Sequence, residues 1–186
     1  MAGAIAVLSV VGRHKAGKTT LVEGLIRQLR RRGLHVATLK HDAHGFDIDV
    51  PGKDSWRHRQ AGAELVLIAS PARLAMVQEL REEAPLPAIL QLAADRAPWL
   101  DLIVTEGYRT GPLPKIEVVQ TARGGPLNAG DPELLALASD RLPLEGAPPG
   151  IPCFDWNDLE GLADLVLARL PQLRRHGPRP RSSERP

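Results

Sequence analysis

The sequence predicts a three-layer α/β protein whose sheet is mostly parallel and is accompanied by one antiparallel hairpin. Short apolar runs typical of buried strands alternate along the chain with segments of helical periodicity. A glycine-rich phosphate-binding pattern stands between the first strand-like run and the first helical segment. Farther along, the apolar runs 65–69 and 73–77 are separated by only three residues, a spacing that favours a hairpin.

The phosphate-binding pattern is Gly, four variable residues and then Gly-Lys-Thr. Its residues are Gly12, Arg13, His14, Lys15, Ala16, Gly17, Lys18 and Thr19, and Thr20 follows. The loop N–H groups and the N-terminus of the following helix would attract a phosphate. Lys18 would place its cation on the outer phosphates, and the Thr19 hydroxyl would ligate Mg²⁺. The pattern predicts a nucleotide site on a P-loop NTPase fold.

The segments on both sides of this loop have the character that the pattern requires. Residues 4–11 form an apolar, partly β-branched run that suits a buried strand. After the loop, Leu21, Leu25 and Leu29 fall at helical spacing, and Gly33 is a suitable helix stop. Strand, loop and helix therefore follow one another in the expected order.

The remaining elements are expected in the following order. A strand at 35–40 precedes a long polar loop at 40–55 and a short helix that Asp54 or Ser55 caps and Gly62 closes. Beyond the hairpin we expect a helix over 86–94, strands over 102–105 and 116–119, and a strand or helical turn over 133–139. The Pro- and Gly-rich stretch 142–152 is typical of a loop, and Asn157 or Asp158 begins a last helix to about residue 170.

Composition places these elements in one domain with a sizeable core. The 186 residues are 43% hydrophobic and 25% charged, as in ordinary globular proteins. Residues 171–186 hold five arginines and one glutamate, so residues 1–170 carry about −2 although the whole chain carries +2. We therefore expect a P-loop domain over 1–170 and a disordered Arg/Pro-rich tail over 171–186. We interpret the tail as a solvated end, with contact to RNA or a membrane as the alternative.

Several functional classes are disfavoured by the same counts. Aromatic residues are 3% and the folded part is slightly acidic, so no nucleic-acid partner is expected. No apolar run approaches the length of a membrane span, and residues 1–11 lack the basic segment of a leader, so no membrane association is expected. Cys153 is the single cysteine, which indicates a small core residue in a reducing compartment, the cytoplasm.

A second nucleotide-site feature lies at the strand 102–105. An acid at the carboxyl end of a buried strand beside the phosphate-binding loop can hold Mg²⁺ directly or through water. Glu106 occupies that end, whereas Asp101 precedes the strand. We therefore predict Thr19 and Glu106 as the metal ligands.

The polar loop 40–55 and its surroundings are expected to bind a substrate or a partner, because long loops in compact domains are usually functional. The candidate residues are Lys40, His41, His44, Asp49, Lys53 and Asp54, together with Lys115. The cations would meet phosphates other than those at Lys18, and the loop would act as a mobile lid or docking surface. His41 and His44 also have a spacing that zinc accepts, but no cysteine or helical histidine pair supports such a site.

Several linked motifs resemble the MobB family, molybdopterin-guanine dinucleotide biosynthesis protein B, over roughly residues 4–169. They are Gly12–Thr20 with Leu21, Lys40-His41-x-x-His44-x-Phe46, Asp49-x-x-Gly52-Lys53-Asp54-Ser55, Ala61-Gly62-Ala63, Ala69-Ser70-Pro71, Asp101-x-x-x-x-Glu106-Gly107-Tyr108 and Pro114-Lys115-Ile116-Glu117-Val118. The resemblance implies a GTP-binding adapter with weak GTPase activity that assists attachment of GMP to molybdopterin. It further implies Mg²⁺, a homodimer, and a partner in the molybdenum cofactor guanylyltransferase, MobA.

The sequence departs from the family pattern at two places. The phosphate-binding loop is bulkier and more basic than is frequent in the family, and Arg13 stands where related dimeric NTPases place a lysine that reaches a partner's nucleotide. The usual Asn-Lys-x-Asp guanine signature is absent, and Asp140 is the candidate replacement for binding the base. No glutamine is evident for placing a hydrolytic water. A small-molecule kinase and a GTP-driven metal-insertion chaperone are the alternatives to the adapter.

Overall fold

The computed structural model describes residues 3–42 and 45–181, which form two compact units. One unit comprises residues up to His41 together with Ile89 onward, and the other comprises Asp42–Ala88. Among the described residues, no helix is long and apolar enough to cross a membrane.

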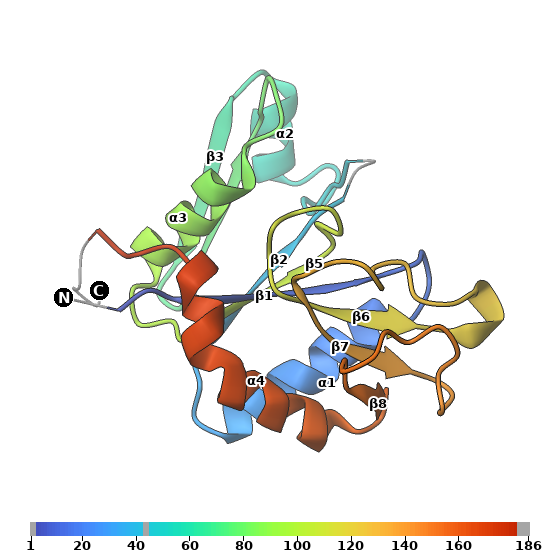
Figure 1. The fold of residues 1–186 in the computed structure, drawn as a ribbon. Coiled ribbons are helices and arrows are strands. Elements are labelled where there is room, and N and C mark those ends of the chain that lie inside the picture. Colours follow the sequence, from blue (N-terminus) through green and yellow to red (C-terminus); the bar gives the residue numbers. More distant parts are fainter. Residues whose placement is uncertain (1–2, 43–44, 182–186) are drawn as a thin grey trace. The chain divides into compact units, whose positions relative to one another are not determined.

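The larger unit is built on a six-stranded parallel sheet in the order β2-β5-β1-β6-β7-β8 (Figure 1). Its strands are β1 (Ala6–Gly12), β2 (Val36–Lys40), β5 (Leu102–Glu106), β6 (Lys115–Val119), β7 (Leu134–Ser139) and β8 (Cys153–Asp155). The central strand β1 is almost entirely buried, which explains its continuous apolar sequence. Because all strands are parallel, their carboxyl ends gather along one edge.

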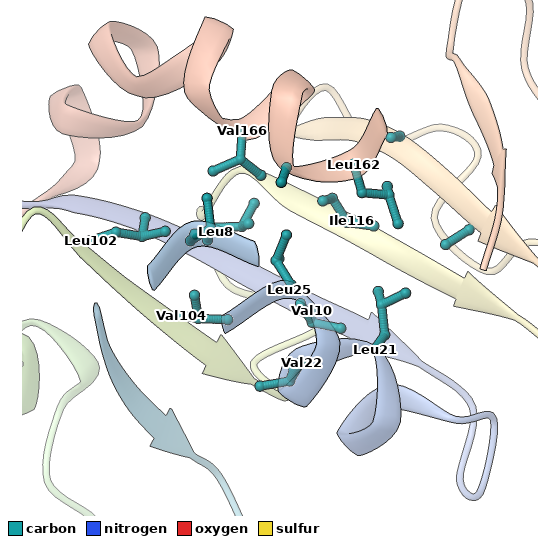
Figure 2. Close-up of a cluster of buried hydrophobic side chains, with 14 of the residues drawn as sticks. Leu8, Val10, Leu21, Val22, Leu25, Leu102, Val104, Ile116, Leu162 and Val166 are labelled. Carbon is teal, nitrogen blue, oxygen red and sulfur yellow. The ribbon is translucent and has the colours of Figure 1, made fainter. Parts of the chain in front are cut away.

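Two helices cover one face of this sheet, and the core lies between (Figure 2). They are α1 (Lys18–Arg31) and α4 (Leu159–Leu173), while α3 (Leu86–Arg96) lies on the other side of the sheet in Figure 1. Leu21 and Leu25 of α1, Val10 of β1 and Leu162 of α4 all belong to the core cluster. The two helices come very close, since a Cβ at Gly24 would lie 2.5 Å from a methyl carbon of Leu159.

The smaller unit contains α2 (Asp54–Gln60) and a hairpin of β3 (Leu65–Ser70) and β4 (Arg73–Gln78). The predicted antiparallel hairpin is confirmed, and it forms a two-stranded sheet of its own. Arg59 organises this unit by bonding the Asp47 carboxylate at 2.8 Å and the Glu79 carboxylate at 3.2 Å. Isolated two-stranded hairpins are marginal in water, and such contacts supply part of the missing stability.

Some of the other sequence predictions are confirmed and others are wrong. The segment 133–139 is a strand, and β8 was not predicted because three residues give too little pattern. Asp158 caps α4 by accepting from the Gly161 N–H at 2.9 Å, as one of two predicted alternatives. The N-cap of α2 is Lys53, so neither Asp54 nor Ser55 caps it.

The predicted boundary of a disordered tail at residue 171 does not agree with the structure. Helix α4 continues through Pro171 to the fully buried Leu173. The segment then returns to the sheet, where the Pro178 carbonyl accepts from the Ile5 N–H at 3.0 Å. Arg181 N–H donates to Asp95 at 2.9 Å, so residues 171–181 are joined to the larger unit. Residues 182–186 lie outside the described part of the chain.

Candidate functional site

The predicted phosphate-binding loop joins β1 to α1 at the carboxyl edge of the sheet. Gly12 has φ 145°, and a Cβ there would overlap the Val118 carbonyl, so only glycine fits. Gly17 has φ 94° and precedes α1 without a side-chain cap. The first N–H groups of α1 therefore have no capping side chain and are available to an anion.

The Lys18 side chain folds back onto its own loop. Its ammonium donates to the carbonyl oxygens of Arg13 at 2.8 Å and Gly12 at 3.3 Å. Burial lowers the pKa of Lys18, the Glu106 carboxylate counteracts this shift, and nearby Lys40 adds to it. A phosphate in the loop would offer this cation a stronger partner than two carbonyls.

The two predicted metal ligands come together across the loop. Thr19 Oγ1 lies 3.0 and 3.1 Å from the two carboxylate oxygens of Glu106. Asp101, the competing acid, lies at the other end of β5, where it accepts from the His35 N–H at 2.8 Å. A hydroxyl and a carboxylate are oxygen ligands of the kind that Mg²⁺ prefers, so these residues fit that ion.

A buried hydroxyl chain fixes β5 beside β1 below this pair. Thr105 Oγ1 donates to Ser9 Oγ at 2.9 Å, and Ser9 Oγ donates to the Gly107 carbonyl at 2.7 Å. Both side chains are fully buried. Because they lie on the strands that carry the loop and Glu106, the sheet holds Glu106 beside the start of the loop.

A cationic groove of about 700 Å³ adjoins the start of the loop. Its lining residues are Gly12, Arg13, His14, Arg109, Ala122, Arg123 and Leu127. The Arg13 guanidinium packs on Gly124, because a Cβ there would meet it at 3.2 Å. The sequence pattern indicated Arg13 and His14 but gave no sign that Arg109 and Arg123 would join them.

Asp140 lies after β7 beside a cavity of about 910 Å³ between the segments 121–126 and 141–146. Its carboxylate accepts from the Thr121 N–H at 2.9 Å. This backbone hydrogen bond is the main cause of the lowered pKa of Asp140, which burial opposes. Asp140 is thus an ionised group at the carboxyl edge of the sheet, two strands away from β1.

A smaller cavity of about 250 Å³ lies at the other end of the loop. It is lined by Gly17, Thr20, Leu21, Trp156, Asn157 and Leu159. Trp156 and Asn157 stand in the turn between β8 and α4. Sequence reasoning missed them, and the only signal was their place before a capped helix.

The predicted substrate or partner loop is divided between the two units. Lys40 pairs in register with Glu106, and the His41 N–H donates to the Glu106 carbonyl at 3.0 Å. His41 also stacks on Tyr108, with ring centroids 4.6 Å apart. Lys40 and His41 therefore lie at the same edge of the sheet as Glu106, one of the predicted metal ligands.

The remaining loop candidates belong to the smaller unit. Asp49 accepts from Ser55 Oγ at 2.8 Å, while Lys53 and Asp54 are exposed. His44 lies outside the described residues. Within the described part of the chain, no three His, Cys, Asp or Glu side chains gather as a metal site.

Lys115 does not belong to an exposed anion-binding loop, which corrects our expectation. It is 1% exposed, and its ammonium donates to the Asp131 carboxylate and to the Arg109 and Gly111 carbonyls. Glu117 is equally buried and accepts from two backbone N–H groups, of Leu127 at 2.7 Å and Asn128 at 2.9 Å. Both charged residues of β6 thus hold loops in place.

Comparison with known proteins gives a consistent result. Residues 7–140 match the sequence model of MobB, molybdopterin guanine dinucleotide synthesis protein B. The chain is 38% identical over 167 residues to the molybdopterin-guanine dinucleotide biosynthesis adapter protein of Escherichia coli K12, covering 88% of this chain and 92% of that one. The adapter protein of Haemophilus influenzae is 37% identical over 141 residues, with 76% and 78% covered. A crystal structure of molybdopterin-guanine biosynthesis protein B has a TM-score of 0.62 at 30% identity, covering 89% of this chain and 99% of that one.

Proposed function

Since the chain belongs to the MobB family, we propose that it binds GTP with Mg²⁺ and assists the attachment of GMP to molybdopterin. Its place in making molybdopterin guanine dinucleotide is that of an adapter, as in the relatives. The expected partner is a MobA-like guanylyltransferase, which would carry out the nucleotidyl transfer. The expected location is the cytoplasm, in keeping with a sequence whose single cysteine, Cys153, can form no internal disulfide.

The single observation that carries the nucleotide proposal is the meeting of Thr19 with Glu106 beside the phosphate-binding loop. In the loaded protein, Mg²⁺ would neutralise charge on the outer phosphates. Thr19 would orient its hydroxyl oxygen toward the ion, and Glu106 would supply the carboxylate. Lys18 would exchange its two carbonyl acceptors for phosphate oxygens.

Base recognition and hydrolysis are the finer parts of the proposal. Asp140 is the candidate acceptor for the guanine N–H groups, since it is ionised and lies at the ligand edge. Hydrolysis is expected to be slow, because no glutamine is evident for placing the attacking water. The adapter role therefore outweighs turnover.

The polar loop 40–55 is proposed to dock molybdopterin or the transferase. Lys40 and His41 adjoin the metal-ligand edge, and Lys53 supplies a further exposed cation in the smaller unit. Replacing His41 and Lys53 by Ala should leave GTP affinity within a few-fold and abolish stimulation of guanine dinucleotide formation. Unchanged stimulation would show that the loop is only a connection.

A homodimer is proposed through the hairpin β3–β4. Its outward side chains include Leu65, Leu67 and Leu74, which are 49%, 57% and 59% exposed. A contiguous apolar hairpin with unpaired strand edges is a surface that a partner normally covers. A second copy is the occupant that the family resemblance implies.

Calorimetry with GTP and Mg²⁺ tests the nucleotide proposal directly. The wild-type protein should bind, and Lys18→Ala should not. Binding of a phosphate acceptor with phosphate transfer would instead indicate a kinase, and stoichiometric uptake of a transition metal would indicate a metal-insertion chaperone. Undiminished GTP affinity in Lys18→Ala would refute the assignment of the loop.

A further inference from the structure

The small cavity at the end of the phosphate-binding loop is not used by the phosphates or the metal. Gly17 and Thr20 of the loop and first helical turn form one wall, and Trp156 and Asn157 form another. A Cβ at Gly17 would lie 3.8 Å from the Trp156 ring, so the indole is in van der Waals reach of the loop. The cavity therefore opens directly beside the place where the loop would hold a phosphate.

The sheet order gives a bound nucleotide a direction. Thr19 faces Glu106 on β5, which is on one side of β1. Trp156 follows β8, which is three strands away on the other side of β1. Thr19 and Thr20 are successive residues of a helix, so their side chains diverge by roughly 100°. A nucleotide whose terminal phosphates bind beside Thr19 would therefore place its nucleoside on the side of Thr20.

Three hydrogen bonds donated by backbone N–H groups hold the Trp156 turn in place. The Trp156 N–H donates to the Ser139 carbonyl at 2.9 Å. Asp155 accepts from the Asn157 N–H at 2.8 Å, and Asp158 caps α4. The indole packs partly against the core and remains half-buried. A fixed aromatic ring with one part still accessible is suited to stacking, because little entropy is lost when a base settles on it.

The size of the cavity favours one part of a ligand. Pockets for whole small molecules measure roughly 300 to 1,000 Å³, whereas this cavity measures about 250 Å³. A planar base fits such a space while the phosphates remain in the loop. The polar side chains of Thr20 and Asn157 lie at its rim, both exposed.

We propose that Trp156 is the stacking platform for the base of the bound nucleotide, with Asn157 and Thr20 contacting the nucleoside. This inference rests on the proposed nucleotide binding at Lys18 and adds to it the subsite that holds the nucleoside. It places the base between the loop and the turn that precedes α4. Asp140 immediately follows Ser139, the residue to which the Trp156 backbone is bonded, so an acceptor for the base edge lies near the platform.

The test compares GTP with inorganic tripolyphosphate, each with Mg²⁺, because tripolyphosphate lacks a nucleoside. Stacking on an aromatic ring is worth about 1–3 kcal/mol per base, so Trp156→Ala should weaken GTP at least about fivefold and leave tripolyphosphate unchanged. Trp156→Phe, which keeps a ring, should recover most of the affinity. Trp99→Phe serves as the matched control and should bind both ligands as the wild type does.

A fluorescence measurement covers the case in which Trp156→Ala does not fold. In a Trp56→Phe/Trp99→Phe protein only Trp156 emits, and saturating GTP should quench it whereas tripolyphosphate should not. Equal loss of both ligands in Trp156→Ala, wild-type GTP affinity in that variant, or no quenching by bound GTP would each overturn the platform. Failure of the wild type to bind either ligand would instead refute the nucleotide site itself.

Discussion

Replacing Lys115 by Met tests whether this lysine supports the fold or a ligand. Its side chain is 1% exposed and is bonded to Asp131, which is 24% exposed, and to two backbone carbonyls. Methionine preserves much of the volume and removes only the ammonium. The substitution therefore leaves a largely buried carboxylate and two carbonyls without their donor.

The expected cost follows from these contacts. Removing one partner of a buried ion pair typically destabilises a protein by about 3–5 kcal/mol, because the other charge stays buried and uncompensated. The partial exposure of Asp131 favours the lower end of that range. For a chain of this size, each kcal/mol lowers Tm by about 2–4 °C, so Lys115→Met should lose roughly 6–12 °C.

Urea unfolding and thermal unfolding measure this loss, and a second substitution serves as the control. Lys115→Met/Asp131→Leu should recover part of the lost stability, since neither charge then remains unpaired. GTP affinity in Lys115→Met should match the wild type under conditions where the variant is folded. Loss of GTP affinity without loss of stability would show that Lys115 serves a ligand and that our reasoning is wrong.

The pH dependence gives an independent check. Burial alone would raise the pKa of Asp131, but hydrogen bonds from Lys115 and the Glu133 N–H bring it below its usual value. A carboxylate with a depressed folded pKa contributes stability above its unfolded pKa, about 3.9, and loses it as pH falls through the folded pKa. The stability difference between wild type and Lys115→Met should therefore be full at neutral pH. It should begin to shrink above about pH 4, because burial raises the Asp131 pKa in the variant, and should shrink further as the wild type loses its contribution at lower pH.

Three further outcomes are expected. Lys18→Ala should leave the empty protein at least as stable as the wild type at neutral pH. The pKa of Lys18 is lowered in the folded wild type, so the wild type's free energy of unfolding should rise with pH as this lysine deprotonates. Unfolding curves of Lys18→Ala should lack that rise. Glu106→Gln should weaken Mg²⁺-dependent GTP binding about tenfold or more, the loss of one charge-assisted contact, while Asp101→Asn should not; an Mg²⁺ titration showing the reverse would exchange their roles. Leu67→Lys should shift the protein from dimer to monomer in light scattering, and a wild type that is already monomeric would exclude the hairpin interface.

Local signals made the phosphate-binding loop and the strands around it predictable. The turn, the anion cradle and the following helix are all specified within about twenty residues, so Gly12, Lys18 and Thr19 lie where the pattern placed them. Glu106 was predictable for a related reason, because a strand-end acid beside a P-loop strand must lie at the same sheet edge.

The burial of individual side chains and the contacts between distant residues were not predictable from local patterns. Nothing in the sequence around Lys115 reveals that Asp131, sixteen residues later, neutralises it in the interior. The hairpin was recognised, but its separation from the main sheet depends on contacts that local pattern does not encode. Trp156 was overlooked because its proposed role depends on packing beside Gly17, which is 139 residues earlier in the chain.

The return of the C-terminal segment to β1 has a consequence for rearranging the chain. Pro178 is bonded to Ile5, and a Cβ at Gly177 would overlap the Ile5 carbonyl, so the two ends of the larger unit touch. They meet at the amino end of β1, the edge of the sheet opposite the phosphate-binding loop. A short linker from residue 178 to residue 5 could therefore close the polypeptide into a circle without crossing the ligand edge. A second protein joined near residue 5 or residue 178 would likewise lie at the edge of the sheet opposite the phosphate-binding loop.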